Sequence, residues 1–349
     1  MSEIDIVTIG SATMDVFVES DEANIVSVCA KDRNADFMSY PYGSKIDMTS
    51  FATNIGGGGL NTAMNFAKLG LKTSAIFKVG DDIYSDGIFS ALKKSTVNLK
   101  SVIQDKSIST GFSIILVSFQ GDRTVLAHRG ANGQIKIEDI DFETIKQAKL
   151  LYIAPLNGES NKVLEPLVKF AQDNGIKVCF NAGSTSLKKG MEHIKKILRV
   201  ANVVVMNKEE ASMCSGIAVR PDTKTEKFSH ETVHPDIKEM LKSLKIQEYQ
   251  VVVITDGGNG AYAYDGNRFY HCPTFPSPVV STLGAGDAFA STFCAALGRT
   301  NLDVGRSLMY ASVNSAAVVS VFGATEGLLT FEEIEERLKI STDYTYMVS

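Results

Sequence analysis

The sequence lacks the cysteine patterns that would mark a zinc site or a fold held by disulfide bonds. It contains five cysteines, an odd and widely spaced set without any CxxC pair. Cys179, Cys272 and Cys294 lie in apolar stretches, so we expect them to be buried free thiols. Such cysteine usage fits a reducing compartment best.

Basic charge and long apolar runs are also missing. Lysine and arginine total 35 against 40 aspartates and glutamates, and the net charge of −5 gives no support to a nucleic-acid partner. No apolar run approaches the length of a membrane span, and the acidic start "MSEIDIVTIG" does not resemble a signal peptide. We therefore expect a cytoplasmic protein that binds neither nucleic acid nor membrane.

The chain does contain a regular alternation of strand-like and helix-like segments. From about residue 149 onward, apolar runs such as "KLLYIAP" and "NVVVMN" alternate with amphipathic segments such as "NKVLEPLVKFAQDNG". Continuously apolar strands separated by helices predict an α/β fold. We expect a three-layer α/β/α body, in which helices cover both faces of a mainly parallel sheet.

Two regions interrupt this alternation. Residues about 13–55 carry no long helical pattern, and residues about 109–129 alternate as two strands joined at "QGDR". We expect both regions to form a small β-sheet appended to the body. The polar residues 216–235 predict a surface excursion, whose role stays open.

Two common nucleotide sites are excluded by the glycine patterns. No GxxxxGK[ST] occurs, so the chain has no Walker-A phosphate loop. "GNGAYA" at 258–263 fits the GxGxxA pattern of a dinucleotide site, but that site requires a following helix. The next residues, "YAYDGNRFYHC", alternate like two strands joined by a tight turn, so we reject this match.

In the stretch "STLGAGDAFASTFCAAL" at 281–297, a glycine turn leads directly into a helix of small residues. The backbone N–H groups of Gly284, Ala285 and Gly286 could bind an anion, such as a phosphoryl group during transfer. Asp287 could take the proton of a hydroxyl nucleophile. On its own, the motif favours the simpler interpretation that Asp287 caps a tightly packed helix.

A second glycine-rich entry into a helix, "GGGGLNTAMNFAKLG" at 56–70, favours the catalytic interpretation. Four consecutive glycines cost conformational entropy and offer no packing, so we expect a ligand to approach the backbone closely there. Asn61 then offers a donor and an acceptor to a polyol.

These stretches resemble the ribokinase-like carbohydrate kinase family, the phosphofructokinase-B type. Both glycine motifs stand in the family's order and separation. Further matching segments are "GSATMD" at 10–15, "GDDIYSDG" at 80–87, "GAN" at 130–132, "MNKEEA" at 206–211 and "ITDGGNGAY" at 254–262. The resemblance spans about residues 4 to 335.

The resemblance implies an enzyme that transfers the γ-phosphoryl group of ATP to a sugar hydroxyl, with Mg²⁺ as a cofactor. It implies one kinase domain over residues 1–340, with lid segments about 13–55 and 109–129, and a C-terminal tail, 341–349. Asp287 would be the general base, and residues 284–286 would form the anion hole.

Further residue roles follow from the same resemblance. The residues expected to hold the nucleotide are Asn207, Glu210, Thr255, Gly257, Gly258, Asn259 and Gly260. Glu210 would also hold magnesium through water. The residues expected to hold the substrate are Asp15, Gly57, Gly58, Asn61 and Asn157.

Three positions depart from the family's pattern. Ser281 stands where the family usually has an aspartate beside a monovalent cation, so a dependence on K⁺ is uncertain. Gly58 replaces a common lysine or serine, and Asn157 stands where ribokinases carry a glutamate toward the sugar. The acceptor is therefore open.

A nucleoside kinase of the same family is the main alternative for this open acceptor. A nucleotide-binding regulator without catalysis is disfavoured by the presence of Asp287, Asn207 and Glu210.

Arg129 could contact a phosphorylated sugar, although a single arginine is more often a surface residue. An exposed lid edge could pair two subunits into a homodimer.

Overall fold

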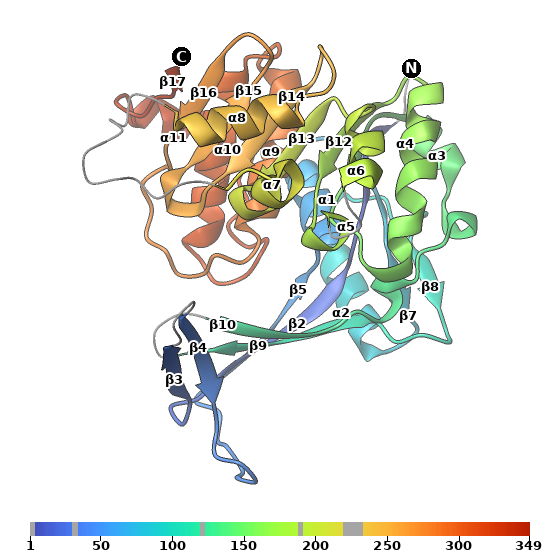
Figure 1. Cartoon of the computed structure of the whole chain (residues 1–349). Helices are drawn as coiled ribbons and strands as arrows, with labels where there is room; N and C mark the ends of the chain where they lie inside the picture. Colours follow the sequence, from blue (N-terminus) through green and yellow to red (C-terminus); the bar gives the residue numbers. More distant parts are fainter. Residues whose placement is uncertain (1–3, 30–33, 119–122, 188–190, 219–232) are drawn as a thin grey trace.

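The computed structural model describes residues 4–29, 34–118, 123–187, 191–218 and 233–349. Its centre is a nine-stranded sheet (Figure 1), in which the strands from β14 to β6 run parallel and β15 to β17 pair antiparallel. In spatial order the strands are β17 (Met347–Val348), β16 (Phe269–Cys272), β15 (Ala261–Tyr264), β14 (Val251–Thr255), β13 (Val203–Asn207), β12 (Lys177–Asn181), β11 (Ala148–Ile153), β1 (Ile4–Ile9) and β6 (Thr73–Ile76).

Helices cover both faces of this sheet, which confirms the predicted α/β/α body. One face packs against α4 (Leu164–Asp173), α6 (Met191–Leu198), α7 (Lys208–Ser215) and α8 (Pro235–Leu244). The other face packs against α1 (Gly58–Lys68), α9 (Ala285–Arg299), α10 (Val304–Val319) and α11 (Phe331–Ile340). The remaining α-helices are α2 (Ile83–Leu92), α3 (Phe142–Lys146) and α5 (Ser184–Leu187).

The strands are apolar throughout because both of their faces are buried. In β11, Leu151 and Ile153 pack into the core on the first face, while Tyr152 packs into the core on the second. Among the described residues, no helix is both long enough and apolar enough to cross a membrane.

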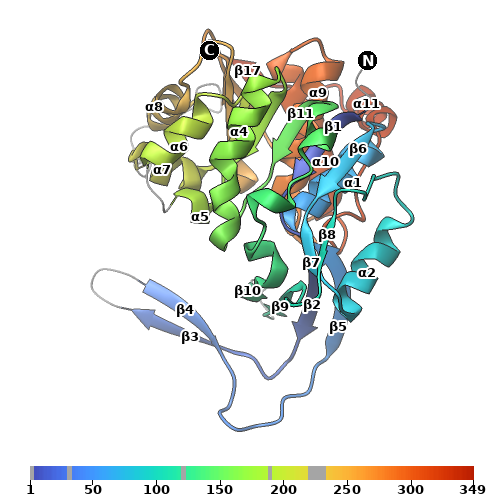
Figure 2. The ribbon, with the colours of Figure 1, turned by 90° about the vertical axis from the view of Figure 1, so that its right-hand side faces the viewer.

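The lid is a four-stranded sheet that projects from the body (Figure 2). Its order is β10 (Arg123–His128), β9 (Gly111–Val117), β2 (Thr13–Glu19) and β5 (Ser50–Gly56). The two β regions predicted near 13–55 and 109–129 therefore meet in one sheet, although residues 119–122 of the "QGDR" turn lie outside the described part. Two smaller pairs are β3 (Asn24–Cys29) with β4 (Asn34–Ser39), and β7 (Lys78–Gly80) with β8 (Ile103–Asp105).

The C-terminal residues 341–349, expected to form a tail, include β17, which pairs with β16. "YAYDGNRFYHC" forms the antiparallel pair β15–β16, as predicted, so a strand rather than a helix follows "GNGAYA". Residues 219–232, most of the expected excursion at 216–235, lie outside the described residues.

The prediction that Cys179 and Cys294 are free thiols is wrong. Cys179 on β12 and Cys294 on α9 form a disulfide bond, although 115 residues separate them in the sequence. Helix α9 covers the face of the sheet on which Cys179 lies, and this packing brings the two side chains together. Spacing along the chain carries no sign of that contact. Cys272 is buried and free, as predicted.

A buried polar network ties α1 to α9 and α10. Asn65 Nδ2 lies 2.7 Å from Ser291 Oγ and 2.8 Å from Thr292 Oγ1. Asn65 Oδ1 accepts a hydrogen bond of 2.9 Å from Asn314 Nδ2, which also contacts Thr292 Oγ1 at 2.8 Å. Asn314 Oδ1 accepts a bond from the backbone N–H of Leu329. The four side chains are fully buried, so their hydrogen bonds fix the helices in one register.

We expect Asn65→Leu to lower the unfolding free energy by about 2–4 kcal/mol, because it leaves several buried partners unsatisfied at ~1–3 kcal/mol each. Urea denaturation would measure the loss. The matched control is Asn174→Leu at the exposed C-terminus of α4, which should cost less than about 1 kcal/mol. Equal losses in the two variants would contradict a role of the network in holding the helices.

Candidate active site

Two helix N-termini meet at the carboxyl ends of β1 and β11. A Cβ added to Gly59, in the first turn of α1, would collide with backbone atoms of Gly10 at 2.7–2.8 Å, so the two backbones touch. On α1, Asn61 Nδ2 donates a hydrogen bond of 2.9 Å to Asp287 Oδ2 on α9. These two residues are 226 positions apart in the sequence. The fold thus joins the predicted base to one predicted substrate residue.

Burial raises the pKa of Asp287 above its ordinary 3.8. The amide of Asn61 acts in the opposite direction, because a hydrogen bond to a carboxylate stabilises its charged form. A carboxylate with a raised pKa is a stronger base. The environment of Asp287 therefore suits acceptance of a proton from a hydroxyl group.

The amide oxygen of Asn61 lacks a hydrogen-bond donor. Asn61 Oδ1 is buried and has no partner among the described residues. Buried polar atoms nearly always have a partner, so an unpaired acceptor beside a carboxylate fits the hydroxyl group of a ligand.

The "GAG" turn presents the first turn of α9 to open space. Gly284 has a φ of +75°, and a Cβ there would lie 2.6 Å from the carbonyl oxygen of Ala324, so this position requires glycine. A Cβ on Gly286 would meet no atom within 4 Å. A Cβ on Gly58 would lie 3.4 Å from Asp287 Oδ1, so Gly58 borders the base. Free N–H groups at the start of this helix can donate hydrogen bonds to an anion that binds beside Asp287.

The expectation that the run of four glycines offers no packing is wrong. Gly57 has a φ of +98°, and a Cβ there would lie 2.6 Å from the carbonyl oxygen of Ser11. Gly59 touches the backbone of Gly10 in the same way. Both glycines let α1 pack directly on the loop after β1. Their absent side chains are therefore required by the fold, whatever ligand binds nearby.

Asp15 lies on the lid strand β2 and is only 5% exposed. Burial raises the pKa of Asp15, while hydrogen bonds from the side chains of Ser113 and Thr13 lower it. A Cβ on Gly56 would collide with Asp15 Oδ2, so this glycine makes room for the carboxylate. Asp15 thus sits where the lid strands β2, β5 and β9 leave the body.

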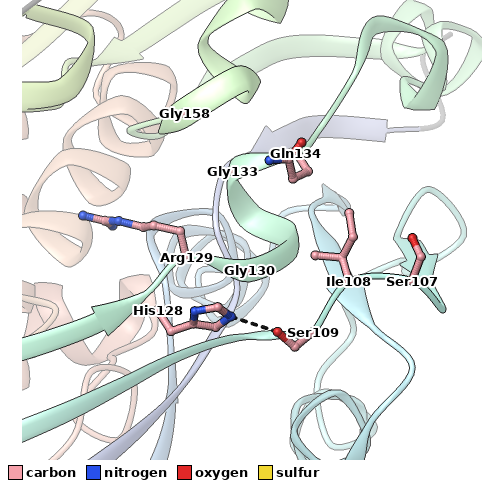
Figure 3. Close-up of a pocket in the computed structure, with 9 residues that line it drawn as sticks. All are labelled: Ser107, Ile108, Ser109, His128, Arg129, Gly130, Gly133, Gln134 and Gly158. Atoms are coloured by element: carbon pink, nitrogen blue, oxygen red, sulfur yellow. Dashed lines mark hydrogen bonds between the residues drawn. The ribbon is translucent and has the colours of Figure 1, made fainter.

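Asn157 is half-buried and precedes a 3₁₀ segment, Gly158–Val163. Gly158 lines a cavity of about 550 Å³ (Figure 3). The other lining residues are Ser107, Ile108, Ser109, His128, Arg129, Gly130, Gly133 and Gln134. His128 Nε2 lies 2.8 Å from Ser109 Oγ, whereas Arg129 extends away from that pair (Figure 3). The cavity therefore lies between the base of the lid and the loop that carries Asn157.

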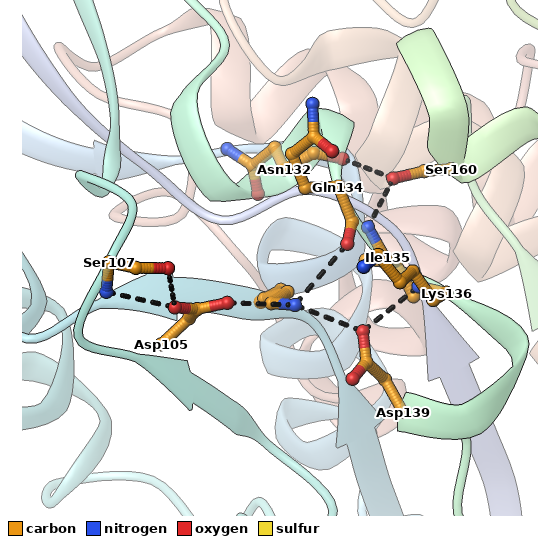
Figure 4. Close-up of polar contacts among 9 residues, drawn as sticks. Asp105, Ser107, Asn132, Gln134, Ile135, Lys136, Asp139 and Ser160 are labelled. Carbon is orange, nitrogen blue, oxygen red and sulfur yellow. Dashed lines mark hydrogen bonds and ion pairs between the residues drawn. The ribbon is translucent and has the colours of Figure 1, made fainter.

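A buried lysine, Lys78, holds the segments around this cavity together, and three of its partners, Asp105, Gln134 and Asp139, are labelled in Figure 4. Lys78 Nζ lies 3.0 Å from Asp139 Oδ2 and 3.1 Å from Asp105 Oδ2. It also donates a hydrogen bond of 3.3 Å to the carbonyl oxygen of Gln134. Burial lowers the pKa of Lys78, but the hydrogen bonds to the two aspartates outweigh this effect and raise it. Lys78 stays charged and anchors the backbone at Gln134.

A second cavity, of about 390 Å³, lies beside residues 284–286, which we call the anion loop. The predicted residues Thr255, Gly257, Gly258, Gly260, Ala285 and Gly286 line it together. Asn259 does not line it, and its Nδ2 instead donates to Asp256 Oδ2 at 3.1 Å. No sequence motif marked the remaining lining residues, which are Thr274, Phe275, Pro276, Ser277, Val279, Thr282, Phe289, Ser312, Ser315, Ala316 and Val319. The apolar, proline-containing segment "TFPSPVV" was the available signal.

Asn207 and Glu210 form the capping box of α7. Asn207 Oδ1 accepts a bond of 2.8 Å from the Glu210 N–H, and Glu210 Oε2 accepts one of 3.1 Å from the Asn207 N–H. Both residues stand at the carboxyl end of β13, beside Thr255 of β14. Among the described residues, no three histidine, cysteine or acidic side chains could enclose a metal. The side-chain oxygens of Asn207 and Glu210 alone fit a magnesium ion that is held mainly by phosphate oxygens and water.

The sequence matches the model of the pfkB family of carbohydrate kinases over residues 5–330. The chain belongs to this family. This match confirms the family that the motifs predicted. It also confirms that the chain is a carbohydrate kinase.

Curated relatives and solved structures agree with this membership. A 5-dehydro-2-deoxygluconokinase of Geobacillus thermodenitrificans is 27% identical over 87% of this chain and 89% of its own length. A bifunctional ribokinase/ribose-5-phosphate isomerase A of Fructilactobacillus sanfranciscensis is 26% identical over 84% of this chain, and the match spans only 51% of that protein. The ribokinase of Arabidopsis thaliana, complexed with ribose and ATP, shares the fold with a TM-score of 0.74, at 22% identity over 96% of this chain and 99% of that one.

We expect Asn61→Leu to move the acidic limb of the kcat/KM profile to higher pH. Activity requires Asp287 without its proton, so it falls as pH drops through the pKa of Asp287. The leucine removes the amide that lowers this pKa, and the pKa then rises further. The values of kcat/KM for the phosphoryl acceptor would be measured across pH with ATP in excess.

Thr62→Val is the matched control on α1, because its hydroxyl bonds the Gly58 carbonyl and not Asp287. Its acidic limb should coincide with that of the wild type. A limb that stays in place in Asn61→Leu would contradict the electrostatic role assigned to the amide.

Proposed function

We propose that this kinase transfers the γ-phosphoryl group of ATP to a hydroxyl group of a sugar. The observation that carries the proposal is the Asn61–Asp287 contact: a half-buried carboxylate and an unpaired buried acceptor lie side by side at a helix N-terminus. A sugar offers hydroxyl groups for both positions. Relatives that act on sugars or sugar acids support the same class of acceptor.

In the proposed reaction the acceptor hydroxyl donates its proton to Asp287. Its oxygen forms a bond to the γ-phosphorus, the bond from that phosphorus to the bridging oxygen breaks, and ADP leaves. The N–H groups of residues 284–286 would stabilise the charge on the phosphoryl oxygens. Magnesium, held through phosphates and water near Glu210, would offset charge on the nucleotide.

The nucleotide would occupy the 390 Å³ cavity, whose apolar walls include Phe275, Val279 and Val319. The sugar would bind between Asp15, Asn61 and the glycines at 57 and 58, with Asn157 at the base of the lid. A nucleoside acceptor is the alternative. The lid's edge strand β10 also supports a proposal that two subunits associate through their lids.

We expect Asp287→Asn to lower kcat by roughly 10²–10⁴-fold, the contribution of a positioned base. The amide keeps the shape of the side chain but cannot accept the proton. ADP release would be measured with magnesium and a panel of neutral sugars, sugar acids, sugar phosphates and nucleosides.

Nucleotide affinity, measured by calorimetry, is the control and should change little in Asp287→Asn. A variant that keeps kcat within a few-fold of the wild type would refute the assigned base. Turnover of nucleosides alone in the wild-type panel would refute the sugar and favour the alternative.

Activity should depend weakly on potassium. The family's aspartate is replaced by Ser281, which supplies an oxygen but no charge, and Ser281 Oγ already accepts a bond of 3.3 Å from the Leu283 N–H. The test replaces potassium by a bulky organic cation at constant ionic strength. A large loss of rate that millimolar potassium restores would contradict this expectation.

A further inference from the structure

The cavity proposed for ATP lacks a positive charge of its own. None of the residues that line it in the described part of the chain is a lysine or an arginine. Kinases stabilise the transferred phosphoryl group mainly with positioned cations and N–H donors. The nearby Lys208 forms an ion pair with Asp256, with 2.5 Å between Nζ and Oδ1, so the charge of this lysine is already offset. A further cation for the phosphates has to come from elsewhere.

The lid brings an arginine to this place. Arg123 begins β10, and its Nη1 donates a hydrogen bond of 2.6 Å to Thr282 Oγ1, 159 residues away in the sequence. Thr282 lines the cavity and stands two residues before Gly284. Figure 1 shows β9 and β10 running beneath the body toward its C-terminal half. The guanidinium group of Arg123 thus lies beside Thr282, next to the anion loop.

The contacts of Arg123 leave it able to bind an anion. No carboxylate of the described residues lies within 4.0 Å of its nitrogen atoms, so its charge is not offset by an ion pair. Thr282 uses one of the five N–H donors of the guanidinium group. The remaining planar donors match the geometry of phosphate oxygens.

We propose that Arg123 is a catalytic residue carried by the lid, which binds the phosphoryl group while it is transferred. This inference rests on the proposed function. It adds a condition to the reaction: the cation is present only when the lid lies over the anion loop. Phosphoryl transfer is therefore coupled to the closed position of the lid, which also covers the sugar.

The test is Arg123→Ala with rescue by guanidinium ions. We expect kcat to fall by about 10²-fold or more, since an arginine that stabilises the transferred phosphoryl group is worth roughly 10³–10⁵ in the best cases. The KM for the sugar should change less than kcat. Millimolar guanidinium should restore part of kcat, whereas methylammonium should not, because only the planar ion reproduces the donors.

Arg268→Ala is the matched control, because Arg268 lies on the turn between β15 and β16 and lines neither cavity. It should keep the wild-type kcat. A free guanidinium ion cannot tie the lid to the body, so a loss in Arg123→Ala without rescue would overturn the proposal in favour of a purely structural latch. An unchanged kcat would overturn it as well. If the wild-type enzyme phosphorylates no carbohydrate, the proposed function fails instead.

Discussion

The hydrogen bond from Asn61 to Asp287 is the contact on which the organisation of the site depends. It joins the first turns of α1 and α9, which belong to opposite ends of the sequence. Asn65 and Asn314 continue this junction inward as a fully buried network. Unpaired amides would be costly there, so the network permits only one relative position of the two helices. That position sets the carboxylate against the glycine-rich start of α1.

Close backbone contact is the second constraint. Gly57 and Gly59 are glycines because a side chain would strike the loop after β1, and Gly284 is glycine because it touches Ala324. These contacts leave the N–H groups at the start of α9 facing the space beside Asp287, whereas the N–H groups of Gly58 and Leu60 on α1 bond to Ser11. The glycines therefore serve the fold first, and the anion-binding property follows from the geometry that they permit.

The sequence predicted the layers, the parallel sheet and the two lid regions, because apolar strands alternate with amphipathic helices and the lid segments break that period. It also pointed to Asp287, Asn61 and the glycines that line the 390 Å³ cavity, since those residues stand in ordered motifs. The α10 residues of the cavity carry no motif and resemble ordinary core residues, and the segment around Phe275 and Val279 offered only its apolar, proline-containing composition as a signal. The pairing of Cys179 with Cys294, and the contact of Arg123 with Thr282, depend on tertiary packing between distant segments, which local patterns do not report.

A single-turnover measurement of phosphoryl transfer against pH tests the central claim that Asp287 is the base. With enzyme in excess over ATP and a saturating acceptor sugar, quench-flow would give the rate of the chemical step alone. The wild-type rate should fall at low pH through one ionisation whose pKa lies above 3.8, and the Asp287→Asn rate should lose that dependence. An ionisation that persists unchanged in Asp287→Asn would contradict the assignment of the base to this residue.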